Sequence, residues 1–189
     1  MEVKRTIKTN VKSFELGDVI SFKMKDGEKV QAKAVKKTEE GMLFITVDCL
    51  KDEYRMFKNP DGMGSMELNY FNSDLRHALN GEILDRFPDE IRSRMDYMRI
   101  GVNYTFDLLR IPTEREIFGA NPYDKEESNT VKQFKGMKNS RNRIAFQGSK
   151  TGTSEWYWLQ QNRGVNCAGY SEYCDASYTG GVRPVFLLS

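Results

Sequence analysis

The first third of the chain alternates between apolar and polar positions, which is the pattern of β-strands. Residues 19–24 and 29–36 alternate in this way, and Asp26-Gly27 between them is a strong hairpin signal. Residues 42–47 form a short continuous apolar run, which is typical of a strand buried on both faces. We therefore expect three consecutive antiparallel strands.

Helical spacing replaces this alternation in the middle of the chain. Either Asn72 or Ser73 can cap a first helix, in which apolar residues recur at helical spacing up to Leu84. Pro88 suits a first-turn position, and the two acidic residues after it favour a second helix through about Met98.

The last part of the chain is richer in loops. Thr113 and Glu116 have the spacing of a capping box, which predicts a short third helix that stops at Gly119. Residues 120–150 are polar and predict a long excursion with little structure of its own. The sequence therefore indicates an α+β fold with short strands, two or three helices and a loop-rich C-terminal third.

Composition narrows the class of protein. The chain has 189 residues, of which 39% are hydrophobic, so it can build one large domain. We expect residues 1–57 to form an N-terminal strand annex and residues 58–189 to form the main domain.

The net charge of +2 gives no general attraction to nucleic acid. With no signal peptide and no long apolar run, we expect synthesis in a cytoplasm and no membrane insertion.

The candidates for metal and thiol chemistry are few. His77 is the only histidine, so histidine-based zinc sites and catalytic triads have one candidate at most. Cys49 lies beside the apolar run and is expected to be a buried thiol. Cys167 and Cys174 are compatible with a reversible disulfide or with two incidental loop thiols. We expect no metal, no cofactor and no catalytic residue.

The tail differs in composition from the rest of the chain. Residues 151–189 contain no lysine, but they contain both tryptophans and four of the nine tyrosines. The two tryptophans, Trp156 and Trp158, fit a packed core best, because large aromatic side chains are mostly buried. Residues 162–178 have no sustained apolar period, and their Tyr, Ser, Gly and Asn residues are typical of a binding surface. We therefore place a ligand-binding tail at residues 156–178.

Three parts of the chain, the last of them made of two segments, resemble in order the motifs of a domain family that is common in phages and gut bacteria. Residues 71–84 are similar to its S-x-x-R-x-x-L-N-x-x-F-L helix, and residues 108–119 to its L-L-S-x-x-E-V-F-G segment. Residues 156–159 (W-Y-W-L) and 181–187 (G-V-R-P-V-F-L) resemble its closing W-L-R-S and G-V-R-P-x-F-x-L segments. Gln160-Gln161 replaces the usual Arg-Ser.

The resemblance implies a C-type-lectin-like fold, shared with formylglycine-generating enzymes and with the variable proteins of diversity-generating retroelements. In those variable proteins, adenine-directed mutagenesis rewrites the last part of the gene, and the altered residues bind the ligand. The tail residues whose identity fits such diversification are Asn162, Arg163, Asn166, Cys167, Gly169, Tyr170, Tyr173, Cys174 and Asp175. The residues that we expect to contact the ligand are Tyr157, Gln160, Asn162, Asn166, Tyr170, Tyr173, Asp175 and Tyr178.

The expected function is therefore non-enzymatic recognition of a protein or cell-surface ligand, by a chain of phage, prophage or bacterial origin. One alternative is a copper-thiolate oxidase of the formylglycine-generating type, in which Cys167 and Cys174 would bind Cu(I). Another is a structural virion component whose tail is buried against a second subunit. Homo-oligomerisation, association with a virion and display on a cell surface stay open.

Overall fold

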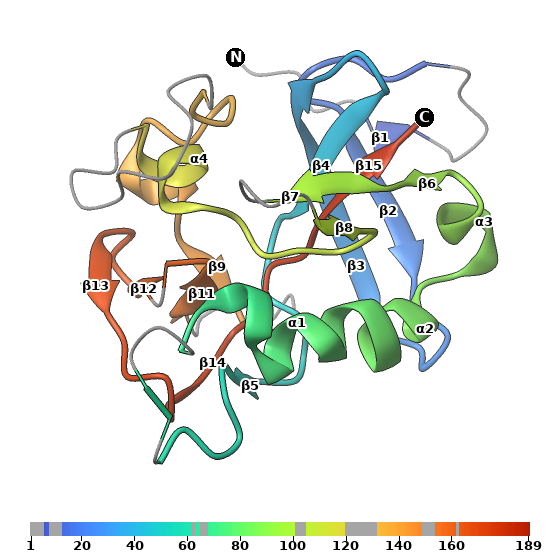
Figure 1. The fold of residues 1–189 in the computed structure, drawn as a ribbon. Helices are drawn as coiled ribbons and strands as arrows, with labels where there is room; N and C mark the ends of the chain where they lie inside the picture. The colour runs from blue at the N-terminus through green and yellow to red at the C-terminus, as the bar shows by residue number, and fades with distance from the viewer. Residues whose placement is uncertain are drawn as a thin grey trace.

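The computed structural model describes residues 6–7, 13–61, 63–64, 68–100, 105–119, 132–148, 154–161 and 163–189. The long strands lie on one side of the molecule and the short strands of residues 145–180 lie on the other (Figure 1). Over the described residues, mostly antiparallel strands and three helices make an α+β fold, which confirms the predicted class. Within the described residues, no helix has both the length and the apolar character needed to cross a membrane.

The main sheet joins the two ends of the described chain. In spatial order it contains β1 (Thr6–Ile7), β2 (Val19–Lys23), β3 (Lys29–Lys37), β4 (Met42–Thr46), β15 (Val185–Leu188) and β6 (Met95–Asp96). The predicted hairpin between β2 and β3 is confirmed, and Gly27 in its turn adopts a φ of 93°, which favours glycine. Within residues 1–57, which we expected to form an N-terminal strand annex, β4 pairs with the C-terminal strand β15.

The central strands of this sheet separate two hydrophobic cores. Every residue of β4 and β15 is buried. Phe44 and Phe186 face the larger core, which also contains the helices and Trp158. Ile45 and Leu187 face the second core, which contains Tyr157 and Val165 of the C-terminal tail. The tail is therefore packed directly on the main sheet.

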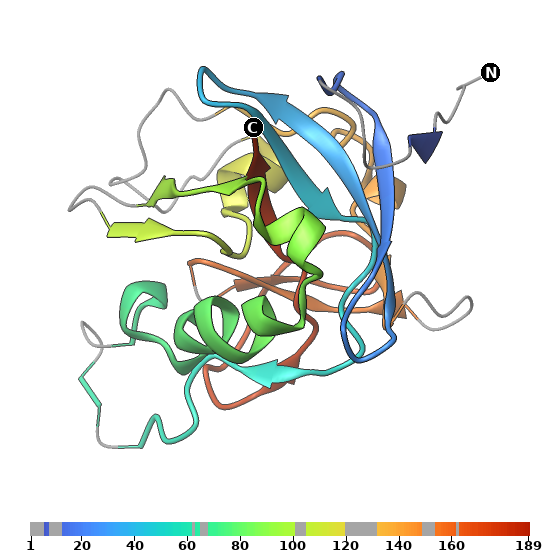
Figure 2. The ribbon, with the colours of Figure 1, turned by 90° about the vertical axis from the view of Figure 1, so that its right-hand side faces the viewer.

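The first predicted helix is a run of 13 residues. It comprises α1 (Asp74–Ala78), a π-helical turn η2 (Leu79–Ile83) and α2 (Leu84–Arg86), after the short turn η1 (Tyr70–Asn72). The hydroxyl of Ser73 accepts a hydrogen bond from the Arg76 amide at 3.1 Å, which confirms the predicted cap. Gly81 has non-helical angles, which makes an irregular turn within the run. Figure 2 shows the run below the curled strands β2, β3 and β4.

The second predicted helix is shorter than its pattern suggests. It is α3 (Asp89–Arg92), and strands β6 and β7 (Met98–Ile100) occupy the remainder of the segment that we assigned to it. Met95 pairs with Leu188 at the edge of the main sheet, and this pairing outweighs the helical pattern. The third helix, α4 (Glu114–Phe118), has the predicted capping box and ends at Gly119, whose φ is 80°.

The excursion predicted for residues 120–150 is partly wrong. Residues 120–131 and 149–150 lie outside the described residues, but residues 132–148 are structured. Phe134 and Met137 are buried in the second core, and a short turn, η3 (Ser140–Asn142), and strand β9 (Ala145–Phe146) follow them. The side chains of Phe134 and Met137 thus anchor this otherwise polar segment to the second core.

The remaining strands form small sheets. They are β5 (Tyr54–Arg55) with β14 (Thr179–Gly180), β7 with β8 (Thr105–Asp107), β9 with β10 (Ser154–Glu155), and the three-stranded sheet of β11 (Tyr157–Leu159), β12 (Arg163–Val165) and β13 (Ser171–Tyr173).

Candidate functional site

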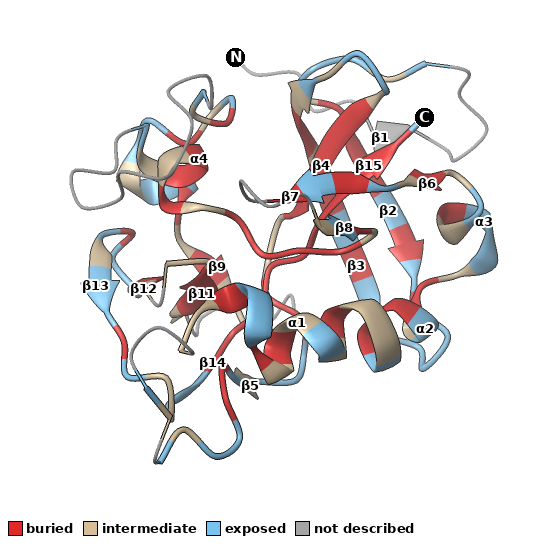
Figure 3. Cartoon of the chain, in the orientation of Figure 1, coloured by how far each residue is buried: buried red, intermediate tan, exposed pale blue. Residues whose placement is uncertain are grey.

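The predicted binding tail begins with the three-stranded sheet. Strand β11 pairs with β12, and β12 pairs with β13, so that β13 is the outer strand. All three residues of β11 are buried, whereas Glu172 and Tyr173 of β13 are exposed (Figure 3). Burial therefore falls from the core strand to the outer strand, as a display surface requires.

The turn between β12 and β13 is held by local hydrogen bonds. The side-chain oxygen of Asn166 accepts hydrogen bonds from the amides of Ala168 and Tyr170, each at 3.0 Å. Arg143, which is buried, donates through Nε to the carbonyl of Gly169 at 2.7 Å. Asn166 thus fixes the conformation of the turn, and its predicted contact with a ligand stays a prediction.

Three of the four tail tyrosines are exposed. The exposed fractions are 59% for Tyr170, 75% for Tyr173 and 60% for Tyr178. Tyr97, outside the tail, is exposed to a similar extent at 65%. An exposed tyrosine offers a large amphipathic area that loses little rotamer freedom when a partner covers it. These three side chains are the predicted site residues that the structure leaves available for such contact.

A second turn orients Tyr178. Oδ1 of Asp175 accepts hydrogen bonds from the Ser177 amide at 2.9 Å and from the Ser177 hydroxyl at 2.7 Å. These hydrogen bonds lower the pKa of Asp175. The Tyr178 amide donates to the Asp175 carbonyl at 3.0 Å, which closes the turn. Asp175 is itself exposed, so it both shapes the turn and presents a carboxylate.

Next to this turn lies a surface hollow of about 310 Å³. Its lining residues are Arg55, Trp156, Ser177, Tyr178 and Thr179. In the pairing of β5 with β14, Arg55 lies opposite Thr179, so a residue from the first third of the chain lies beside the tail. Of the predicted site residues, only Tyr178 lines the hollow.

Two other predicted residues point inward. Tyr157 is fully buried, and its hydroxyl donates to the Arg143 carbonyl and accepts from Arg183, both at 3.0 Å. Burial also raises the pKa of this phenol. Gln160 donates through its side-chain amide to the Ile111 carbonyl at 2.8 Å. The prediction that Tyr157 contacts a ligand is therefore wrong, because it belongs to the core, and Gln160 links the tail to the segment before α4.

Asn162 lies outside the described residues, although its neighbours on both sides are described. The predicted role of Asn162 stays a prediction.

The tail is supported from below by the first turn of α4. The Ser171 hydroxyl donates to Oε1 of Glu114 at 2.7 Å, and the Glu114 amide donates to Gln161 at 2.9 Å. Arg163 lies 3.9 Å from the same carboxylate oxygen. Glu114 is buried, and its other oxygen has no hydrogen-bond partner among the described residues. A capping role alone does not account for this carboxylate, because it also links α4 to β12 and β13.

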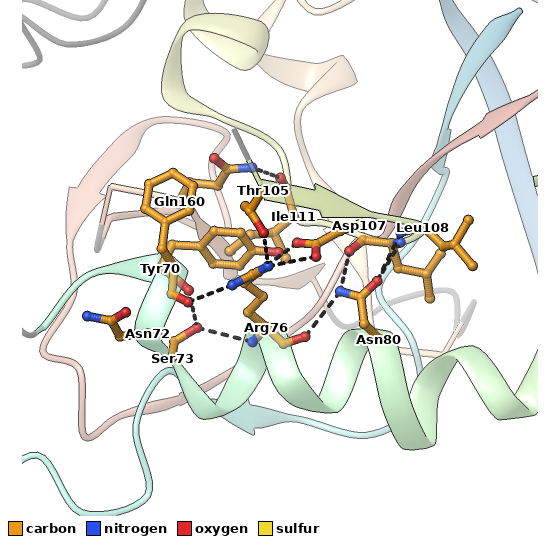
Figure 4. Close-up of polar contacts among 12 residues, drawn as sticks. Tyr70, Asn72, Ser73, Arg76, Asn80, Thr105, Asp107, Leu108, Ile111 and Gln160 are labelled. Carbon is orange, nitrogen blue, oxygen red and sulfur yellow. Dashed lines mark hydrogen bonds and ion pairs between the residues drawn. The ribbon is translucent and has the colours of Figure 1, made fainter. Parts of the chain in front are cut away.

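The polar residues of the family-like helix motif hold the fold together. Arg76 forms a paired contact with Asp107, at 2.7 and 2.9 Å, and donates to Thr105 (Figure 4). Asn80 accepts hydrogen bonds from the amides of Leu108 and Leu109 and donates to the Leu109 carbonyl (Figure 4). Both residues tie the helical run to the strand and segment that precede α4.

The other two motifs contribute buried arginines. Arg110 forms a paired contact with Glu116, at 2.7 and 2.6 Å, and Glu116 is also the capping-box residue of α4. Arg183 donates twice to the Thr46 carbonyl, at 3.0 and 2.9 Å. The motif residues thus hold the segments of the fold together, and the surface residues between the motifs are not needed for these contacts.

The three cysteines are free. Cys167 is exposed, whereas Cys49 and Cys174 are buried. Burial raises the pKa of the Cys49 thiol to about 12 and that of the Cys174 thiol to about 11. The disulfide that the sequence left open between Cys167 and Cys174 is therefore not formed in this structure.

Sequence reasoning missed the hollow. Arg55 lies about a hundred residues before the tail and has no motif around it, so no spacing could connect it with Tyr178. Ser177 and Thr179 are ordinary turn residues in the sequence. The available signal was the pair of glycines that follows them, which predicts a close approach of backbone and a bulky side chain.

No curated protein and no solved structure matches this chain. One family model matches residues 40–189, which is most of the chain and includes β4, the helices and the whole tail. Its description is a domain of unknown function, so it assigns no activity. The chain belongs to this family, DUF6273.

Proposed function

We propose that this chain is a non-enzymatic ligand-binding protein, and that its binding surface is the outer face of the tail. The residues that carry the surface are Tyr170, Tyr173, Asp175 and Tyr178. The observation that favours this function most is the exposure of three large tyrosines on a segment whose backbone is fixed by buried neighbours. Exposed tyrosines among small polar residues are typical of binding surfaces.

The rigid frame lowers the cost of binding. The turn at Asn166 and the turn at Asp175 are both closed by hydrogen bonds before any ligand arrives. A partner therefore has to immobilise side chains but not the backbone, and each tyrosine has few rotatable bonds. We expect the tyrosines to act as anchors, with the small polar residues between them adjusting the fit.

We further propose a C-type-lectin-like fold and diversification of the tail by a retroelement. Two features favour this: the motif residues Asn80 and Arg183 form hydrogen bonds within the fold, and the tail residues Asn166, Tyr170 and Tyr173, which fit diversification, lie in the turn or on the surface. Tyr157, in contrast, is part of the core and should be excluded from variation.

Sequencing of the gene's 3′ end and its flanks tests the diversification. A near-copy of the segment encoding residues 156–188 is expected, with mismatches opposite adenines that fall on codons for exposed residues. A neighbouring reverse transcriptase should accompany it. A flank without such a copy, or mismatches that fall on the codons of Tyr157 and Trp158, would contradict this part of the proposal.

Binding itself is tested by a retention assay. The immobilised protein is exposed to intact bacterial cells, to a glycan array and to a protein array, and the double variant Y170A/Y173A is compared with Y97A. Tyr97 is as exposed as the tail tyrosines but lies outside the tail. Retention should be lost in the double variant alone. Equal retention by both variants would place binding elsewhere.

The alternative copper-thiolate site finds less support. Cu(I) binds thiolates, and the pKa of Cys174 is raised by its burial and by nearby Glu172. The alternative of a virion component with a buried tail makes a different prediction, namely that the pure chain assembles through the tail. Light scattering of the wild type and of Y170A/Y173A distinguishes self-assembly from receptor binding.

A further inference from the structure

The hollow beside Tyr178 has a fixed aromatic wall. A Cβ atom on Gly180 would lie 2.5 Å from the Trp156 ring, and one on Gly164 would lie 2.8 Å from it. Only glycine at these two positions lets the indole rest against strands β12 and β14. Trp158 holds it from another side, edge to face, with ring centroids 4.8 Å apart. The Trp156 wall is therefore built into the backbone.

Trp158 is itself fixed. Its indole nitrogen donates to the Tyr54 carbonyl at 2.8 Å, and Tyr54 is the neighbour of Arg55 in β5. The aromatic pair and the strand that carries the arginine are thus linked by a hydrogen bond. These contacts fix one wall of the hollow in the absence of a ligand, as in most preformed small-ligand sites.

The opposite rim carries a cation. Arg55 is exposed, and none of the described residues forms a hydrogen bond or ion pair with its guanidinium. A guanidinium presents planar paired donors that match a carboxylate. The Ser177 hydroxyl donates to Asp175, so its oxygen can still accept a hydrogen bond, and Thr179 is the cross-strand partner of Arg55.

We propose that this hollow binds one acidic sugar ring, a uronate residue of a glycan, without a metal ion. The ring's C–H face would lie against Trp156 and Tyr178, its carboxylate would pair with Arg55, and its hydroxyls would meet Ser177 and Thr179. The volume of about 310 Å³ suits a single ring with a substituent. The inference rests on the proposed function, because Tyr178 belongs to both surfaces.

An acidic peptide fits these features less well. A glutamate side chain would pair with Arg55 but would leave the two aromatic rings without a matching apolar face. A neutral sugar would use the rings but would leave the guanidinium without its anion. A uronate ring has both a carboxylate and an apolar C–H face, which is why we favour it.

The experiment titrates the full chain with two probes, a galacturonate tetramer and a glucuronate-containing hyaluronan tetrasaccharide, and follows tryptophan fluorescence and calorimetric heat. The methyl esters of both probes keep the ring and remove the charge, and a tetraglutamate peptide keeps the charge and removes the ring. The protein variants are R55A, R55K and, as a control outside both the hollow and the tail, Y97A.

We expect at least one of the two acidic probes to bind and to change the fluorescence of Trp156. R55A and methyl esterification should each weaken this binding about 10-fold to 100-fold, the value of a charge-assisted hydrogen bond. R55K should recover part of the loss, and Y97A should bind like the wild type. Because the Arg55 side chain is exposed, R55A should melt like the wild type.

Absence of binding by both acidic probes would overturn the inference. Equal binding of a probe and its methyl ester, or binding of tetraglutamate as strong as that of the acidic sugars, would overturn it as well. The proposed function is judged separately by retention of Y170A/Y173A. Loss of retention in that variant with no uronate binding removes the hollow alone, whereas uronate binding through Arg55 with unchanged retention removes the tyrosine surface alone.

Discussion

The hydroxyl of Ser171 donates to Oε1 of Glu114 at 2.7 Å, across 57 positions of the chain. This contact joins the outer strand of the tail to the first turn of α4. Glu114 is buried, and Ser171 precedes the exposed residues Glu172 and Tyr173. One buried carboxylate thus supports the strand from which the exposed tyrosine projects.

Removing this support should loosen the tail. We expect Glu114→Ala to lower the free energy of unfolding by about 1–3 kcal/mol, because the Ser171 hydroxyl loses its acceptor and the Arg163 guanidinium loses a nearby carboxylate. Hydrogen exchange should rise in residues 163–173. Glu90, an exposed acidic residue in the first turn of α3, provides the matched control, and Glu90→Ala should change neither quantity. Unchanged exchange in Glu114→Ala would mean that the tail is held by other contacts.

The Tyr157 hydroxyl should matter for stability and not for binding. Tyr157→Phe removes one donor and one acceptor from a buried network with Arg143 and Arg183. A cost of about 1–3 kcal/mol in thermal or urea unfolding is expected. Tyr97→Phe, at an exposed position, should cost almost nothing. A variant that unfolds like the wild type but no longer retains its partner would return Tyr157 to the binding surface.

Gly180 should tolerate no side chain. In Gly180→Ala the new methyl group meets the Trp156 ring, which is fixed by Trp158, so strain of about 1–3 kcal/mol is expected in the unfolding free energy. Tryptophan fluorescence should shift in the same variant. Thr179→Ala on the same strand serves as control, and its free energy of unfolding should lie within about 0.5 kcal/mol of that of the wild type. Equal stability of the two variants would show that Trp156 moves freely.

The cysteines should react with alkylating reagents in a fixed order. Alkylation requires the thiolate, and the pKa values of about 11 for Cys174 and about 12 for Cys49 leave very little thiolate at pH 8. Exposed Cys167 should therefore be modified first by iodoacetamide, as measured by peptide mass spectrometry. Because the thiolate fraction grows as pH rises toward the pKa, Cys174 should react about tenfold faster per pH unit up to about pH 11. Simultaneous reaction of all three thiols at pH 8 would contradict the burial.

Local signals in the sequence predicted several elements correctly. The hairpin at Asp26-Gly27, the cap at Ser73 and the capping box of Thr113 and Glu116 each depend on a few neighbouring residues, and each is present in the structure. Such signals are reliable because their hydrogen bonds are formed within the same segment.

Features that depend on distant contacts could not be predicted in this way. Met95 lies in a strand and not in the expected helix because it pairs with β15. Tyr157 is buried because its hydroxyl forms hydrogen bonds with Arg143 and Arg183 in the core. Arg55 joined the hollow through a pairing with Thr179, 124 positions later. The tail's composition indicated a surface correctly at Tyr170, Tyr173 and Tyr178, but composition does not say which side of a short strand faces the core.

The affinity of a partner recovered in the retention assay tests the central claim most directly. It should be measured for the wild type, Y170A/Y173A and Y97A, together with their melting temperatures. We predict that the double variant loses at least about 2 kcal/mol of binding free energy, as hot-spot aromatic residues do, while all three proteins melt alike. Unchanged affinity in the double variant, or a loss of affinity that follows a large drop in melting temperature, would contradict a tail that binds through its exposed tyrosines.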